Sequence, residues 1–168
     1  MKNHSNQRTF LKVPYWSQDE NHYTCGPICL RMVLSYLKGK RLNKKEYLRI
    51  LDLTMNGDPT KESGTSKLKL KRAIKERDCK YRTIYGEKGI AKALERKHPV
   101  IIYCRMTDED GERYKHYIVV TGRDDKDNFY INDPCNGKPG KIQKKIFMKR
   151  AQKLNWGDKQ RGIEVYKD

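Results

Sequence analysis

Apolar residues in the first half of the chain recur at helical spacing. After Cys25 they stand three or four residues apart as far as Leu37, and this spacing predicts one amphipathic helix that ends near Gly39. Proline is tolerated only in the first turn of a helix, because its missing N–H has no partner there in any case. Pro27 therefore places Cys25 at the N-terminus of this helix.

Three further helices are expected in this half of the chain. Asn43 followed by Glu46 has the spacing of a capping box, in which each residue satisfies a backbone N–H of the other, and it predicts a helix start at this point. A very basic helix is expected at 65–74 and another at 90–94, where apolar residues again recur at helical steps.

The second half of the chain changes to short β-rich runs separated by charged or glycine-containing turns, which is typical of an antiparallel sheet. The expected strands, including two from the first half, are 10–13, 81–85, 100–104, 114–122, 129–133 and 163–166. Helices followed by strands predict an α+β fold, in which a helical half packs against a sheet half and leaves a cleft between them.

Length and charge limit the classes of protein. The 168 residues suffice for one core, so we expect a polar tail at 1–9 and a single domain at 10–168. The net charge of +17 attracts acidic proteins or polyanions, but the basic residues are scattered, and specific nucleic-acid binding is not expected. No apolar run approaches the roughly 18 residues of a membrane span, and the chain start lacks a signal peptide's apolar core. We therefore expect a soluble, cytoplasmic protein.

Cys25 stands at a loop-to-helix junction and is followed by Gly26. The unsatisfied N–H groups and the dipole of a helix N-terminus favour an anion, and therefore the thiolate form that acts as a nucleophile. Gly26 would allow a substrate to approach closely. A buried free cysteine without a chemical role is the alternative interpretation.

A nucleophilic cysteine needs a base, and His116 is the best placed of the four histidines because it lies inside a predicted strand. His4 and His22 are expected to be exposed, and His98 is expected to have a capping or surface role. For His116 itself, the alternative is an ordinary half-buried strand histidine.

Asp133 ends the strand that is expected to form a hairpin with the His116 strand, where its carboxylate would fix the tautomer of the imidazole. A loop of two or four residues leaves the two side chains on one face. A loop of one or three sends them to opposite faces, because side chains alternate along a strand. The triad therefore requires an even loop between Arg123 and Asn128. An ordinary turn aspartate before Pro134 is the alternative.

Gln18 precedes the cysteine in the loop before the helix. Its amide N–H, together with the backbone N–H of Cys25, would stabilise an oxyanion on an attacked carbonyl. A solvated loop glutamine is the alternative. The expected mechanism needs neither a metal nor an organic cofactor.

The other cysteines indicate neither a zinc knuckle nor a disulfide scaffold, because the five form no Cys-x-x-Cys pair and their number is odd. Cys29 shares the apolar stripe of the first helix, and Cys104 ends an apolar strand, so both are expected in the core. Cys135 closely follows Asp133, and a redox link between Cys135 and Cys25 is conceivable.

Four landmarks resemble the papain-like cysteine peptidases that cut double-glycine leader peptides in bacteriocin export, and their stand-alone relatives. They are Val-Pro-Tyr-Trp-Ser-Gln at 13–18, Cys-Gly-Pro at 25–27, His-Tyr-Ile-Val-Val at 116–120 and Tyr-Ile-Asn-Asp-Pro at 130–134. The resemblance spans residues 10 to 135 and implies a papain-like fold. It also implies Gln18 in the oxyanion hole, Cys25 as nucleophile, His116 as base and Asp133 as its orienting acid.

The residues and the resemblance together predict a cysteine hydrolase, a peptidase that cleaves a peptide or isopeptide bond of a peptide or protein substrate through an acyl-enzyme on Cys25. Two alternatives remain at this point. The same site would be a transferase or cross-linking enzyme if the acyl group passed to an amine. A catalytically inactive protein of this fold would be a basic binding module for nucleic acid or an acidic protein.

Overall fold

The computed structural model describes residues 8–20, 22–107, 111, 113–126, 128–152 and 161–168. Its helices are α1 (Cys25–Leu37), α2 (Lys44–Met55), α3 (Lys67–Glu76), α4 (Gly86–Glu95) and α5 (Lys144–Gln152). Its strands are β1 (Thr9–Phe10), β2 (Lys80–Tyr85), β3 (Val100–Thr107), β4 (Arg113–Arg123), β5 (Asn128–Asn132), β6 (Gly140–Gln143) and β7 (Arg161–Tyr166). None of the helices within the described ranges is long and apolar enough to cross a membrane.

The helices of the first half begin where the sequence predicts. Asn43 caps α2, and its side chain accepts from the backbone N–H of Glu46, whose carboxylate accepts from the Asn43 N–H in return. Ser66 caps α3 by accepting from the backbone N–H of Lys69. These bonds satisfy N–H groups that have no partner inside the helix. The expected helix starts are therefore confirmed.

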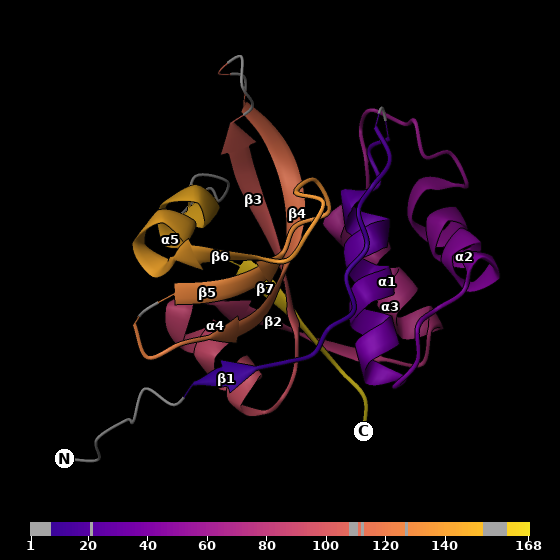
Figure 1. Ribbon diagram of the computed structural model, residues 1–168. Coiled ribbons are helices and arrows are strands. Elements are labelled where there is room, and N and C mark those ends of the chain that lie inside the picture. The colour runs from indigo at the N-terminus through magenta and orange to yellow at the C-terminus, as the bar shows by residue number, and fades with distance from the viewer. Residues whose placement is uncertain (1–7, 21, 108–110, 112, 127, 153–160) are drawn as a thin grey trace.

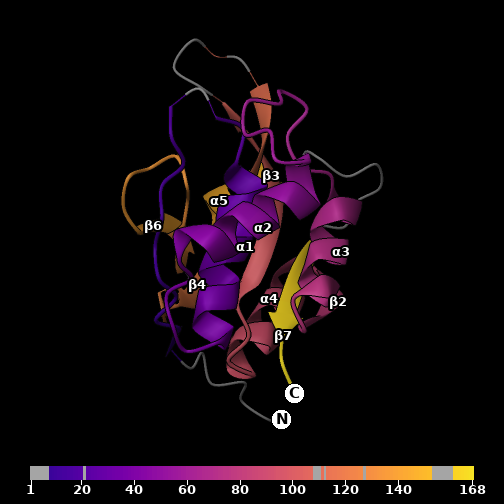
Figure 2. The same ribbon diagram turned by 90° about the vertical axis from the view of Figure 1, so that its right-hand side faces the viewer.

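The strands form one antiparallel sheet, in the order β2, β7, β3, β4, β5, β6, with β1 paired to β4. Figure 1 shows α1, α2 and α3 together on one side of the sheet and α5 on the other, and Figure 2 looks onto the first group. The predicted α+β class, with helices packed on an antiparallel sheet, is confirmed.

The hairpin between β4 and β5 differs from the expected one. Arg123 pairs with Phe129, so positions 124–128 separate the paired residues, and their number is odd. The prediction of an even loop is therefore wrong. With strictly alternating strands, an odd loop would place the two site residues on opposite faces of the sheet.

A bulge in β4 restores the alignment. The register shifts after Val120, and Val119 pairs with Asn132, so β4 carries one more residue than β5 across this stretch. One extra residue reverses the alternation a second time. His116 and Asp133 consequently return to the same face of the sheet, and their side chains meet.

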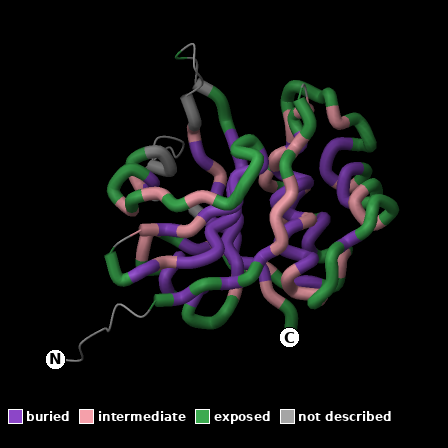
Figure 3. The backbone as a smooth tube through the Cα atoms, in the orientation of Figure 1, coloured by how far each residue is buried: buried purple, intermediate pink, exposed green. Residues whose placement is uncertain are grey.

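One hydrophobic core joins residues from Leu11 to Val165 and includes the inner faces of α1 and of the central strands. Figure 3 shows the buried residues gathered over the sheet and the helix beside it. The expected core positions of Cys29 and Cys104 are confirmed, because their side chains are 0% and 1% exposed.

His98 takes part in the end of α4 through its backbone N–H, which donates to Ala93 at 2.9 Å, and its side chain joins a cluster around Glu164 on β7. Glu164 is fully buried, and its carboxylate accepts from Arg96 at 2.9 and 2.8 Å and lies 2.7 Å from Nδ1 of His98. Burial alone would raise the pKa of Glu164, but these partners lower it below its usual value. The cluster fixes the end of α4 to β7, next to the β2 edge of the sheet.

Candidate active site

Cys25 is the first residue of α1 and is half-buried. The preceding Thr24 occupies the capping position, but its side chain does not cap the helix and instead bonds with Tyr47. The first turn also carries no acidic residue. Within the described residues, neither Thr24 nor an acidic side chain of the first turn therefore accepts from the N–H groups of this helix end, directly at the thiol.

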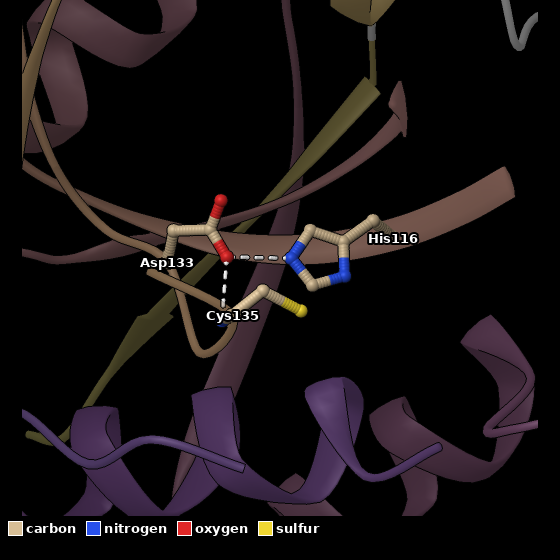
Figure 4. A group of neighbouring side chains, drawn as sticks. All are labelled: His116, Asp133 and Cys135. Atoms are coloured by element: carbon tan, nitrogen blue, oxygen red, sulfur yellow. Dashed lines mark hydrogen bonds and ion pairs between the residues drawn. The ribbon is translucent and has the colours of Figure 1, made fainter. Parts of the chain in front are cut away.

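His116 on β4 and Asp133 after β5 form a buried pair. Nε2 of His116 lies 2.7 Å from Oδ1 of Asp133, and the two side chains are 2% and 1% exposed. Figure 4 shows the carboxylate facing one edge of the imidazole. A carboxylate in this position holds a proton on Nε2 and leaves Nδ1 for another partner. The thiol of Cys25 is near enough to the imidazole to contribute to its pKa.

Two opposing effects set the protonation of His116. Burial alone would lower the pKa of His116, because it disfavours the charged form. The hydrogen bond with Asp133, followed by the nearby thiols of Cys135 and Cys25, outweighs burial and raises the pKa well above its usual value. An imidazolium at neutral pH is the partner that a thiolate requires.

The segment after Asp133 is tied to the segment that leads to α1. The hydroxyl of Tyr15 donates to the backbone oxygen of Asp133 at 2.8 Å, and the backbone N–H of Gln18 donates to Pro134 at 2.9 Å. The side-chain amide of Asn132 donates to the backbone oxygen of Val13 at 3.1 Å. These bonds bring two of the sequence landmarks together although more than half of the chain separates them.

Gln18 is half-buried, and its amide is held in a fixed orientation. Nε2 donates to the backbone oxygen of His22 at 2.9 Å, which uses one of its two N–H groups. Oε1 is buried and has no hydrogen-bond partner among the described residues. His22, expected to be exposed, is half-buried and holds this amide, whereas His4 lies outside the described residues.

The structure indicates that Gly26 is required for packing, whereas the sequence suggested that it leaves room for a substrate. A Cβ at this position would lie 2.9 Å from Cβ of Thr65, closer than side-chain atoms approach. The glycine therefore lets the loop before α3 pack on the first turn of α1. The hydroxyl of Tyr117 holds the same loop by donating to the backbone oxygen of Thr65 at 3.1 Å.

Two groups at the site go beyond the four expected residues. Cys135 is exposed, and its backbone N–H donates to Oδ1 of Asp133 at 2.9 Å. Tyr15 steadies the backbone of Asp133, as described above. The sequence held a signal for both, since Tyr15 lies within the landmark at 13–18 and Cys135 stands two positions after Asp133, but spacing alone does not show where either side chain points.

A thiol at an uncapped helix end, beside a buried histidine–aspartate pair on a neighbouring sheet, is the arrangement of a papain-like cysteine hydrolase. The comparison of sequences agrees with this class. The model of the peptidase C39-like family matches residues 10–161, so the chain belongs to that family and is a cysteine peptidase.

Solved structures share the fold. A double glycine motif protease from an AMS/PCAT transporter, solved in complex with the leader peptide, is 23% identical with a TM-score of 0.63, over 95% of this chain and 94% of that one. The peptidase domain of Streptococcus ComA, a bifunctional ABC transporter, is 22% identical with a TM-score of 0.65, over 93% and 99%. The cysteine protease interpain A of Prevotella intermedia is 14% identical with a TM-score of 0.56, over 81% and 86%. No curated protein sequence matches significantly.

Proposed function

We propose that Cys25 is the nucleophile of this peptidase, that His116 is its acid and base, and that Asp133 orients the imidazole. The observation that carries the proposal is the buried contact of 2.7 Å between His116 and Asp133, with His116 on β4, the strand that packs against α1. Gln18 completes the site as a donor to the oxyanion.

The chemistry follows from these groups. The thiolate of Cys25 attacks the peptide carbonyl, and the oxyanion accepts from the backbone N–H of Cys25 and from the second amide N–H of Gln18. His116 then passes its proton to the leaving amine, and the acyl-enzyme forms. A water molecule gives a proton to His116 and attacks the thioester, which releases the acid and restores the thiolate–imidazolium pair.

We propose that the substrate is a peptide with two small residues before the cleaved bond. The support is similarity, because one neighbour in fold is a double glycine motif protease that was solved with its leader peptide. The test is a set of reporter peptides that differ only in carrying Gly-Gly, Ala-Ala or Leu-Leu before the scissile bond. We expect kcat/KM to fall by about 10²-fold or more from Gly-Gly to Leu-Leu, because a close-fitting site excludes branched side chains. Equal cleavage of all three would reject this specificity, and an amide product formed with added amines would indicate acyl transfer instead.

We also propose that the basic surface binds an acidic part of the substrate next to the site. Lys67 and Lys71 on α3 line a cavity of about 240 Å³ together with Tyr103. Tyr103 precedes Cys104, which pairs with His116 across β3 and β4, so the cavity lies along the strand next to the proposed base. A glutamate side chain would find two ammonium groups there and an aromatic wall.

This second proposal predicts a charge-dependent effect of one lysine. Replacing Lys71 by glutamine should lower kcat/KM for peptides that carry glutamate near the bond by roughly fivefold, the effect of a partly exposed ion pair, and leave matched glutamine peptides unchanged. Lys45, exposed on α2, provides the control, since Lys45→Gln removes the same charge elsewhere. An equal effect of both variants would show that only net charge matters.

Two further points stay proposals. A single domain at 10–168 is supported by the one core that joins Leu11 to Val165, although β1 begins at Thr9, and residues 1–7 of the expected tail lie outside the described residues. Location in the cytoplasm stays a prediction from the sequence.

A further inference from the structure

Cys135 places a second thiol at the catalytic pair. The metal-binding atoms of His116, Asp133 and Cys135 all lie within 4.8 Å of one another. Figure 4 shows the sulfur of Cys135 turned toward the imidazole. The peptidase mechanism described above gives this thiol no task.

A tight turn fixes Cys135 in this place. The backbone N–H of Asn136 donates to the backbone oxygen of Asp133 at 3.1 Å, and Pro134 restricts the turn at its second position. The Cys135 N–H also bonds to the Asp133 carboxylate. Because Cys135 is exposed whereas His116 and Asp133 are buried, the cluster can be reached from solvent on the side of the thiol.

The donor atoms are those that zinc prefers. Thiolate, imidazole and carboxylate are its three usual protein ligands, whereas Mg²⁺ and Ca²⁺ take oxygen ligands alone. Neighbouring ligands of a tetrahedral Zn²⁺ lie roughly 3.3–3.8 Å apart, given its bond lengths. The present separations run from 2.7 Å between Nε2 and Oδ1 up to the 4.8 Å limit, so shifts of about 1 Å would complete the geometry.

The carboxylate oxygen that faces the other two residues is Oδ1 of Asp133, which bonds to the His116 ring and to the Cys135 N–H. Figure 4 shows Oδ2 turned away from both residues, so Oδ1 is the oxygen that would bind the cation.

We propose that Cys135, His116 and Asp133 form a Zn²⁺ site with a water as the fourth ligand, and that zinc bound there inhibits the peptidase. Zinc replaces the proton on Nε2, and the Cys135 thiol loses its own, so binding releases two protons to solvent. The remaining ring proton then stays on Nδ1, because giving it to a leaving amine would produce an imidazolate. The inhibition rests on the proposed function, whereas the binding does not.

The binding test uses the purified chain, freed of metals and kept in a phosphine reductant so that no thiol oxidises. Zn²⁺ alone is titrated in competition with a chromophoric chelator. We expect one tight site per chain in the wild type, an affinity at least about 100-fold lower in Cys135→Ser, and no competition from Mg²⁺. Cys79→Ser is the control, because Cys79 follows α3 and is not one of the site residues, and it should retain the site.

A spectroscopic measurement separates this site from adventitious binding. Co²⁺ in the wild type should show a sulfur-to-cobalt charge-transfer band that is lost in Cys135→Ser and kept in Cys79→Ser. The absence of that band, or equal zinc affinity in wild type and Cys135→Ser, would overturn the site.

Inhibition is measured for each variant as the loss of peptidase rate relative to the same variant without zinc. Zinc should inhibit the wild type at a concentration at least about 100-fold below that needed for Cys135→Ser. Equal inhibition of both would mean that zinc acts on Cys25 alone, and the proposed switch would be wrong. A chain that binds zinc as described but cleaves no peptide would leave the metal site standing and reject the proposed function.

Discussion

Peptide hydrolysis is lost when Cys25 is replaced by alanine, with the rate expected to fall by about 10⁴-fold or more. The helix end and the buried His116–Asp133 pair have no nucleophile to act on in this variant, so neither can compensate. The measurement is kcat/KM on a peptide that the wild type cleaves, together with a mass-spectrometric search for the acyl-enzyme. His116→Ala should lose a similar factor, because a nucleophile and its base act as one unit.

The control for this loss is Cys79→Ala, which removes a thiol outside the site. It should retain the wild-type rate, and thermal unfolding should show that all three variants are folded. Substantial activity in a folded Cys25→Ala would show that the thiol is not the nucleophile, whatever the family to which the chain belongs.

Removal of the Asp133 charge should move the alkaline limb of the pH–rate profile to lower pH. His116 is buried, and burial lowers its pKa, whereas the carboxylate is the largest effect that raises it. In the Asp133→Asn variant, only the nearby thiols oppose the effect of burial, so the pKa of His116 falls. The imidazolium of His116 therefore loses its proton at a lower pH. We expect a shift of about 1–3 pH units, the usual effect of a close opposite charge.

A paired variant separates charge from orientation. Asparagine keeps an oxygen that can accept from Nε2, whereas alanine removes both the charge and the acceptor. Asp133→Ala should therefore show the same pH shift and in addition a loss of about 10²-fold at the pH optimum. A pH profile unchanged in Asp133→Asn would contradict the assignment of Asp133, and a normal optimum rate in Asp133→Ala would contradict its orienting role.

The helices and the main strands could be predicted because each carries a local signal. Asn43 and Glu46 define a helix start by spacing alone, and the apolar stripe after Cys25 defines a buried face. The pairing of His116 with Asp133 is different, because it depends on the sum of a loop length and a bulge. Gly122 stands at this bulge, but a glycine inside a strand can equally mark a close backbone approach, and here a Cβ at Gly122 would lie 2.5 Å from the backbone oxygen of Thr9, so the residue alone does not specify a bulge.

The sequence predicts neither a strand nor a helix in the segment 140–152, because its apolar residues follow neither pattern. β6 is an edge strand of four residues with one apolar side chain, Ile142, and α5 places Ile146, Phe147 and Met148 in a row rather than at helical spacing. Phe147 is nevertheless buried against Phe129, with ring centroids 5.0 Å apart. The long-range contact makes this helix stable, and no local pattern reports it.

The position of β7 makes one edge of the sheet depend on the last strand to be synthesised. The strand comes last in the sequence but lies between β2 and β3 in the sheet. During synthesis, residues 161–166 leave the ribosome after every other strand, and β2 has no partner in the sheet until they arrive. The strands beside His116, β3 and β5, pair with β4 without β7, so the last strand completes the β2 edge of the sheet rather than the site.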